Sequence, residues 1–190
     1  GQNLGDLGAD VIKVENMMGD TSRWTGPPER DGINGFFSQF NRNKRAISVD
    51  MKSGAGIAIV RKLALQADVI ICIYRPGVAE RLGFGYDSLR EENPGLVFVS
   101  VSGFGPDGPY ADQPVYDLVV QGMTGAMPSQ GDDGPPQMIK SVIADKSAAI
   151  AASTAALAAL LARERNGGAG QHVHVPMINA YAQLALPDMM

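Results

Sequence analysis

The chain has 190 residues, 45% of them hydrophobic, so it can bury a full-sized core and is not a disordered segment. Its 16 lysines and arginines nearly balance 20 aspartates and glutamates, which leaves a net charge of −4. This balance excludes a nucleic-acid-binding protein that relies on a broad basic surface, so any phosphate recognition should be local. The one cysteine, Cys72, cannot form a disulfide within the chain, which favours a reducing compartment and a cytoplasmic protein.

No apolar run in the sequence reaches the roughly 18 to 20 residues that a membrane helix needs. The longest candidate, residues 148–162, is mostly alanine and is interrupted by Ser153 and Thr154. The first residues show neither the basic nor the apolar region of a signal peptide. We therefore expect a soluble protein that does not associate with a membrane.

The first third of the chain predicts two strands joined by a long loop. The opening residues are typical of the last turn of a helix that stops at Gly8, and residues 10–15 (DVIKVE) alternate as a strand does. A loop rich in glycine and proline follows at 16–35, and loops of this length are usually functional. A short helix at 36–40 and the basic run NRNKR at 41–45 precede a strand at 46–50. By itself, NRNKR is more typical of a solvated surface turn than of a phosphate site.

The next residues alternate between helices and strands. Ser53 can cap a helix at 54–66, the apolar run at 68–74 predicts a buried strand, and a pair of short helices at 78–92 leads to another strand at 96–102. Strands that alternate with helices in this way favour parallel pairing. The sequence therefore predicts an α/β fold: a doubly wound, mostly parallel, Rossmann-like sheet with flanking helices.

The last part of the chain predicts helices at 116–124 and 146–165 and a strand at 171–176. We expect one Rossmann-like domain over residues 1–176, followed at 177–190 by the start of a helix or linker.

A glycine-rich loop, GFGPDG at 103–108, follows a predicted strand as a dinucleotide fingerprint would. However, Pro106 and Pro109 fall where the phosphate-binding helix should begin, and no acidic strand end follows about 20 residues later. This pattern favours a rigid loop at the carboxyl end of a strand, where it can still line a binding crevice.

Two pairs of side chains are candidates for ligand binding. Arg75 follows a predicted strand and Arg81 comes about one helical turn later, a position and a residue type that suit phosphate recognition. His172 and His174 share one face of a predicted strand, but two imidazoles without a third ligand indicate an exposed strand face rather than a metal site. We predict no metal.

Asp145 stands before the alanine-rich helix, where an aspartate is typical of an N-cap. A carboxylate at a helix N-terminus stays ionised, so the same residue is also available as a nucleophile. Cys72 lies in a predicted buried strand, where inert packing is its expected role.

Several stretches, in this order along the chain, resemble one known family. They are LGDLGADVIKVE at 4–15, GD-x-x-R at 19–23, NRNKRAISVDMKS at 41–53, ADVII-x-x-YRPGVAERLGFGYDSL at 67–89, NPGLVFVSVSGFGPDGPY at 93–110, PVYDLVVQGMTG at 114–125 and GQHVHV at 170–175. The set is similar to the class III coenzyme A transferases, which include formyl-CoA and carnitine CoA-transferases and extend to the α-methylacyl-CoA racemases.

The resemblance implies that Asp145 is the nucleophile and that CoA passes from an acyl-CoA to a small carboxylic acid through an aspartyl-CoA thioester. It implies no tightly bound cofactor, with CoA and acyl-CoA acting as substrates. The CoA contacts that it implies are Val49, Lys52, Ile73, Tyr74, Arg75 and Arg81. It also implies an interlocked homodimer, and that this chain is roughly half of a two-domain enzyme, lacks an N-terminal strand and is inactive alone.

The sequence departs from the family pattern at three places. The racemase branch has a histidine where this chain has Tyr116, which favours the transferase reaction. The family's Glu-Asn-Phe is replaced by Cys72-Ile73-Tyr74, and Asn16 stands where an arginine is frequent, so contacts to CoA should differ in detail. A racemase or epimerase of the same family, and a nucleotide-binding domain without catalysis, are the alternatives.

Overall fold

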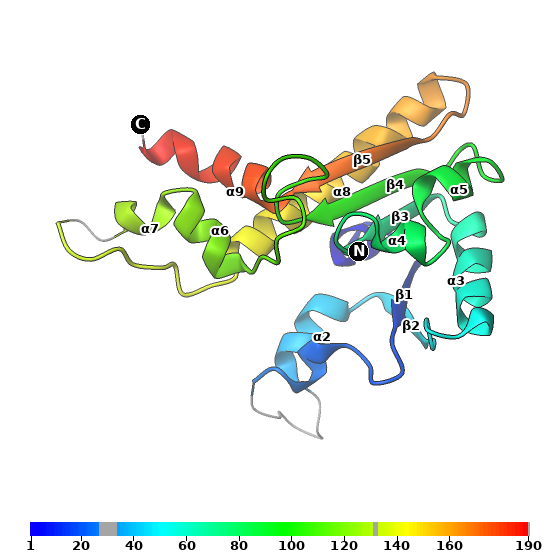
Figure 1. The fold of residues 1–190 in the computed structure, drawn as a ribbon, viewed down its shortest axis with the longest axis horizontal. Coiled ribbons are helices and arrows are strands. Elements are labelled where there is room, and N and C mark those ends of the chain that lie inside the picture. Colours follow the sequence, from blue (N-terminus) through cyan, green and yellow to red (C-terminus); the bar gives the residue numbers. More distant parts are fainter. Residues whose placement is uncertain (27–33, 131–132, 190) are drawn as a thin grey trace. The chain divides into compact units, whose positions relative to one another are not determined.

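The computed structural model describes residues 1–26, 34–130 and 133–189. It divides the chain into two compact units, Gly1–Ala64 and Leu65–Met190, each with its own sheet. Every strand pair in both sheets is parallel, and helices stand between the strands along the chain (Figure 1). The predicted α/β fold with parallel strands is therefore confirmed.

The first unit begins with helix α1 (Gln2–Asp6) and strand β1 (Val11–Glu15). A 3-10 turn, η1 (Thr21–Trp24), helix α2 (Gly35–Asn41), strand β2 (Lys44–Ser48) and helix α3 (Gly54–Gln66) follow. In the β1–β2 sheet, Val11 lies opposite Lys44 and Glu15 opposite Ser48. The predicted strand at 46–50 thus starts two residues early, because the end of the NRNKR run pairs with β1.

Two of the three cations of NRNKR are matched by nearby carboxylates of the same unit. Arg42 bonds to Asp6, with Nη2 2.6 Å from Oδ2, and Arg45 bonds to Asp10, with Nη2 2.5 Å from Oδ2. All four side chains are at least partly exposed. These pairs agree with the expectation of a surface segment.

The predicted cap of α3 is also present. The Ser53 hydroxyl accepts a hydrogen bond from the Gly56 N–H at 3.0 Å. Gly56 itself lies against the preceding turn: a Cβ atom there would be 1.9 Å from the Asp50 carbonyl oxygen. Only glycine permits this close approach of helix and turn.

In the second unit, strands β3 (Val69–Cys72), β4 (Val97–Ser102) and β5 (Gln171–Pro176) form a sheet in the order β3-β4-β5. The central strand is the most buried, and Val97 and Val99 have no solvent exposure. Helices α4 (Val78–Arg81) and α5 (Tyr86–Arg90) connect β3 to β4 in two pieces, as predicted. They lie in front of the sheet in Figure 1, and α8 (Ile143–Arg165) lies behind it.

Helix α8 packs against β4, β5 and the flanking helices α6 (Asp117–Met123) and α9 (Met177–Ala185). The alanines on its inner face, Ala144, Ala148, Ala152, Ala156 and Ala159, are all buried. Such small side chains let the helix lie close to the sheet. Two short elements were not predicted: η1, which lies in the predicted loop at 16–35, and α7 (Ala126–Ser129), which contains a proline. The final 3-10 turn η3 (Leu186–Met189) follows α9 in the segment where the start of a helix or linker was expected.

In the described part of the chain, α8 is the one helix that is long and apolar enough to cross a membrane, with a mean hydropathy of 1.3. However, 39% of its most apolar window is buried within the structure. Core helices of globular proteins share these properties, so the helix is weak evidence for a membrane span.

Candidate functional site

The carboxyl ends of the three strands in the second unit border a cavity of about 150 Å³. One row of side chains crosses the sheet there, because Cys72 pairs with Ser100 and Ser100 pairs with His174 in the strand register. All three residues line the cavity, together with Ser102, His172 and the segment that follows β3. This edge is where open α/β sheets bind ligands.

Two of the predicted CoA contacts, Tyr74 and Arg75, line this cavity. Arg81 lies near them, since its Nη1 atom is 3.2 Å from the position that a Cβ on Gly77 would take, and Gly77 is part of the cavity wall. Gly77 has a φ of +77°, a conformation that glycine adopts without strain and that turns the chain into α4. The segment after β3 thus brings two guanidinium-bearing residues and an aromatic ring to one edge. Ile73, 78% exposed, is absent from the cavity lining.

His172 and His174 share one face of β5, as predicted, and their ring centroids are 4.1 Å apart. The expectation of an exposed strand face is wrong for His172, which is half-buried between Tyr86 and Phe98. Its Nε2 atom forms a 2.8 Å hydrogen bond with the Ser100 hydroxyl. Burial, followed by the neighbouring His174, lowers the pKa of His172, so this imidazole is neutral at neutral pH.

Cys72 is 7% exposed, which agrees with its predicted packing role. Burial raises the pKa of its thiol, so it stays protonated and weakly reactive at neutral pH. Although it is buried, Cys72 also lines the cavity at the strand ends.

Asp145 lies in the first turn of α8 and is exposed to solvent. The prediction that it caps the helix is wrong: the N-cap residue is Val142, three positions earlier. Partial burial of its carboxyl group and, next, the Asp117 carboxylate raise the pKa of Asp145. The expectation that the helix start strengthens its ionisation therefore has the wrong direction.

The carboxylate that caps α8 belongs to Asp117, in the first turn of α6. Its Oδ2 atom accepts hydrogen bonds from the backbone N–H groups of Ala144 at 2.7 Å and Asp145 at 3.0 Å. Its Oδ1 atom accepts a hydrogen bond from Gln121 Nε2 at 2.6 Å. The sequence does not reveal this role, because a cap from a residue 28 positions away leaves no local pattern.

The remaining predicted contacts, Val49 and Lys52, belong to the first unit. The Val49 side chain is 4% exposed, and its N–H donates to the Glu15 carbonyl oxygen at 2.9 Å. Lys52 is exposed in the turn before α3, where its N–H donates to Asp50 Oδ1 at 3.0 Å. Their contact with CoA, like that of the residues in the second unit, stays a prediction.

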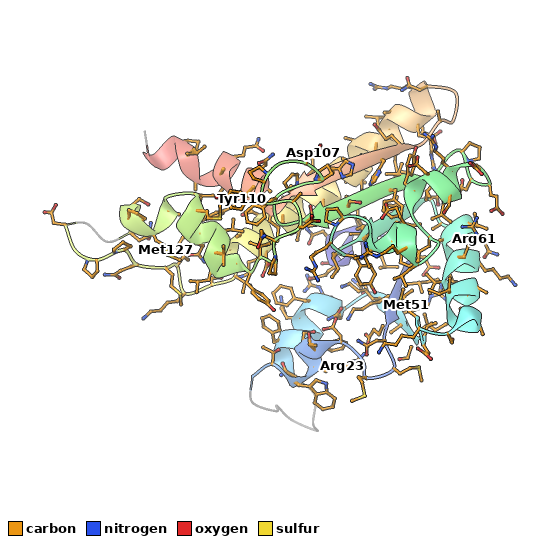
Figure 2. The ribbon with its side chains drawn as sticks, viewed as in Figure 1. Arg23, Met51, Arg61, Asp107, Tyr110 and Met127 are labelled. Atoms are coloured by element: carbon orange, nitrogen blue, oxygen red, sulfur yellow. The ribbon has the colours of Figure 1, made fainter. Side chains whose placement is uncertain are left out.

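The structure explains the GD-x-x-R motif at 19–23 as a support for the loop after β1. Asp20 caps η1, and Arg23, which is labelled in Figure 2, donates to both carboxylate oxygens of the buried Glu15, from Nε at 3.1 Å and Nη2 at 3.0 Å. Lys13 also bonds to Glu15 and Asp20, and the Arg23 guanidinium stacks on Phe37 with its Cζ 3.8 Å from the ring centroid. The motif thus fixes the path of the chain before the exposed Trp24.

Comparison with known proteins decides the family. The family model described as CoA-transferase family III matches residues 1–190. The chain belongs to CoA-transferase family III. Among its curated relatives in this family are a succinate–glutarate CoA-transferase of Agrobacterium fabrum, 43% identical over 94% of this chain, and a formyl-CoA:oxalate CoA-transferase of Streptomyces avermitilis, 40% identical over 96%.

A solved structure of a CAIB/BAIF family protein from Brucella suis has the same fold as this family III chain. It superposes with a TM-score of 0.93 at 39% sequence identity and covers 100% of the chain. The chain spans about half the length of these proteins: 46% and 44% of the two curated relatives and 51% of the solved structure. It is therefore part of the family's domain rather than all of it, in agreement with the expectation of a partial chain.

Proposed function

We propose that the complete protein is an acyl-CoA:carboxylate CoA-transferase in which Asp145 is the nucleophile. The observation that carries this proposal is Asp145, a solvent-accessible residue in the first turn of α8, in a chain whose family relatives are named as CoA-transferases. A raised pKa makes the ionised carboxylate a stronger base and hence a better nucleophile.

The reaction begins when an oxygen of the Asp145 carboxylate attacks the thioester carbonyl carbon of the donor. The carbon–sulfur bond breaks, leaving a mixed anhydride and CoA thiolate. The thiolate then attacks the Asp145 carboxyl carbon, which releases the donor acid as a carboxylate and leaves an aspartyl-CoA thioester. The acceptor carboxylate reverses these two steps, forming the new acyl-CoA and regenerating Asp145. Each intermediate is an activated carboxyl group, so no step is steeply uphill.

No step of this sequence moves a proton, so the site needs no general base beside Asp145. The position before Asp117 is Tyr116, which is 79% exposed, rather than a histidine able to abstract an α-proton at neutral pH. This residue favours transfer over racemisation.

The cavity at the strand ends supports binding of part of CoA. Arg75 and Arg81 can pair with phosphate oxygens, and the Tyr74 ring offers an apolar surface beside them. Val49, Lys52 and Ile73 complete the proposed contacts. CoA is a substrate in this scheme, and the acceptor is a small carboxylic acid.

The test of this proposal is replacement of Asp145 in the complete protein by alanine and by asparagine. Both changes should lower turnover at least about a thousandfold, because neither side chain can form the acyl anhydride. Hydroxylamine added to the native protein with acyl-CoA should convert Asp145 to a hydroxamate that mass spectrometry finds on its peptide. The exposed Asp112, changed to asparagine, is the matched control and should keep native turnover. Native turnover in Asp145→Ala would exclude Asp145 as the nucleophile.

A further inference from the structure

Asp117, on α6, is a buried carboxylate that accepts three hydrogen bonds, two of them from the first turn of α8. The residue is 9% exposed, and its three donors are the N–H groups of Ala144 and Asp145 and the Gln121 side chain. Gln121, 2% exposed, is itself held by the backbone of Ile139 and Ser141, the segment that leads into α8. One buried pair on α6 therefore fixes both the start of α8 and the chain just before it.

The free N–H groups at a helix start ordinarily bind the side chain of the N-cap residue, water or a nearby carboxylate, and the positive end of the helix favours an ionised carboxylate in the first turn. Such bonds stabilise the ionised form and make the carboxylate a weaker base. Here Asp117 Oδ2 occupies the N–H groups of Ala144 and Asp145, and its charge offsets the positive end of the helix. Within the described residues, the Asp145 carboxylate accepts no hydrogen bond, so its lone pairs stay available.

We propose that Asp117 is a positioning residue for CoA transfer: its negative charge and its hold on the N–H groups at the start of α8 together keep the Asp145 carboxylate a strong nucleophile. This inference rests on the proposed function of Asp145. In this scheme Asp117 does not touch the substrate and acts only through Asp145.

The electrostatic surroundings of Asp145 agree with this role. Partial burial is the larger cause of its raised pKa, and Asp117 is the charged neighbour that adds to it. Lys146, the adjacent cation on α8, donates to the Ser141 hydroxyl at 2.8 Å. Tyr181 of α9 is buried in one apolar cluster with Val120 and Ala144. Burial, and then Asp117, raise the pKa of Tyr181, so it is neutral at neutral pH and adds no charge.

Replacing Asp117 by asparagine in the complete protein tests the role of the charge. The asparagine Oδ1 atom can still accept both backbone hydrogen bonds, while the negative charge is lost. We expect the pKa of Asp145 to fall. It can be measured by ¹³C NMR titration of protein labelled at the aspartate carboxyl carbons, in which Asp145→Asn identifies the Asp145 signal. We also expect kcat to fall about three- to tenfold at a nearly constant KM for acyl-CoA. A role in stability alone would not lower that pKa.

Two further variants complete the experiment. Asp117→Glu keeps the charge and should keep the pKa of Asp145 raised, so a fall of that pKa in Asp117→Glu counts against the inference even if Asp117→Asn fails to fold. Asp112→Asn removes an exposed aspartate of the preceding loop and should change neither quantity. An unchanged pKa of Asp145 in Asp117→Asn, or a fall of equal size in Asp117→Glu, would overturn the inference. Because the titration does not depend on turnover, this result is separate from the test of Asp145 as nucleophile.

Discussion

At the scale of single residues, the buried Glu15 carboxylate is stabilised in its ionised form by several hydrogen-bond donors. Its side chain is 3% exposed, yet it accepts hydrogen bonds from Arg23, Lys13 and the Asp20 N–H. The Arg23 hydrogen bonds are the largest cause of the lowered pKa of Glu15, and they outweigh the opposing effect of burial. Arg23 therefore stabilises the loop after β1 through a group that could not be buried without it.

We expect Arg23→Met to weaken this loop, since it leaves the buried Glu15 with fewer donors. The local opening free energy of residues 11–24 should fall by about 1–3 kcal/mol at pH 7, measured by hydrogen exchange and mass spectrometry on the complete protein. The matched control is Arg90→Met, because Arg90 pairs with Asp87 on the open surface and should contribute little. Equal protection of residues 11–24 in native protein and Arg23→Met would contradict the prediction.

The difference in protection of residues 11–24 between the native protein and Arg23→Met should shrink in acid. Asp20 has its pKa lowered to about 2, because hydrogen bonds from Lys13 and Ser22 outweigh the effect of burial, and the pKa of Glu15 is lowered as well. A carboxylate with a lowered pKa stabilises the fold above its unfolded pKa, near 4 to 4.5. That stabilisation is lost as the pH falls through the folded pKa. Protection of residues 11–24 should thus decline between about pH 4.5 and pH 2 in the native protein, and less steeply in Arg23→Met.

The sequence marks Asp145 and the arginines after β3 as candidates, since each belongs to a local pattern: a carboxylate before an alanine-rich run, or a cation after an apolar strand. Their roles stay predictions. The sequence did not reveal Asp117 as the cap of α8, nor the Ser100–His172 hydrogen bond. Both join residues far apart in the chain, and only strand register and helix packing bring them together. The role of Arg23 was missed for the same reason, because its partner lies on the preceding strand.

At the scale of elements, Gly56 is the residue that decides how α3 meets the turn before it. Gly56→Ala should destabilise the first unit by about 1–3 kcal/mol, because the new methyl group would overlap the Asp50 carbonyl oxygen. Gly54→Ala is the matched control: nothing lies within 4 Å of its Cβ position, and alanine favours the helix. Hydrogen exchange of residues 44–66 measures both. Equal protection in the two variants would show that the turn yields to the methyl group.

Periodicity predicted the strands and the longer helices because each has a buried face of regular spacing. Helix boundaries were less accurate, and the start of α8 shows why. The sequence predicts a helix from residue 146 with Asp145 as its cap, but the carboxylate of Asp117 binds the N–H groups at the helix start and lets the helix begin at Ile143, three residues earlier. Tertiary contact thus overrides the local signal.

At the scale of the whole molecule, we propose that the complete protein is a homodimer, as the family resemblance implies. The outer face of α8 supports an interface, because Ile150, Leu157 and Leu161 are 61%, 46% and 53% exposed along one side of the helix. Light scattering coupled to size exclusion should give twice the mass of one complete chain. A single-chain mass at micromolar concentration would contradict this proposal.

Asp117 and the Asp145 N–H group lie 28 residues apart in the chain, so their hydrogen bond depends on the folding of the second unit. The connection between α6 and α8 must close a loop, with its entropic cost, before the two N–H groups find their acceptor. The raised pKa of Asp145 depends on this contact and on burial, so a chain in which α6 and α8 have not met carries a chemically ordinary aspartate at position 145.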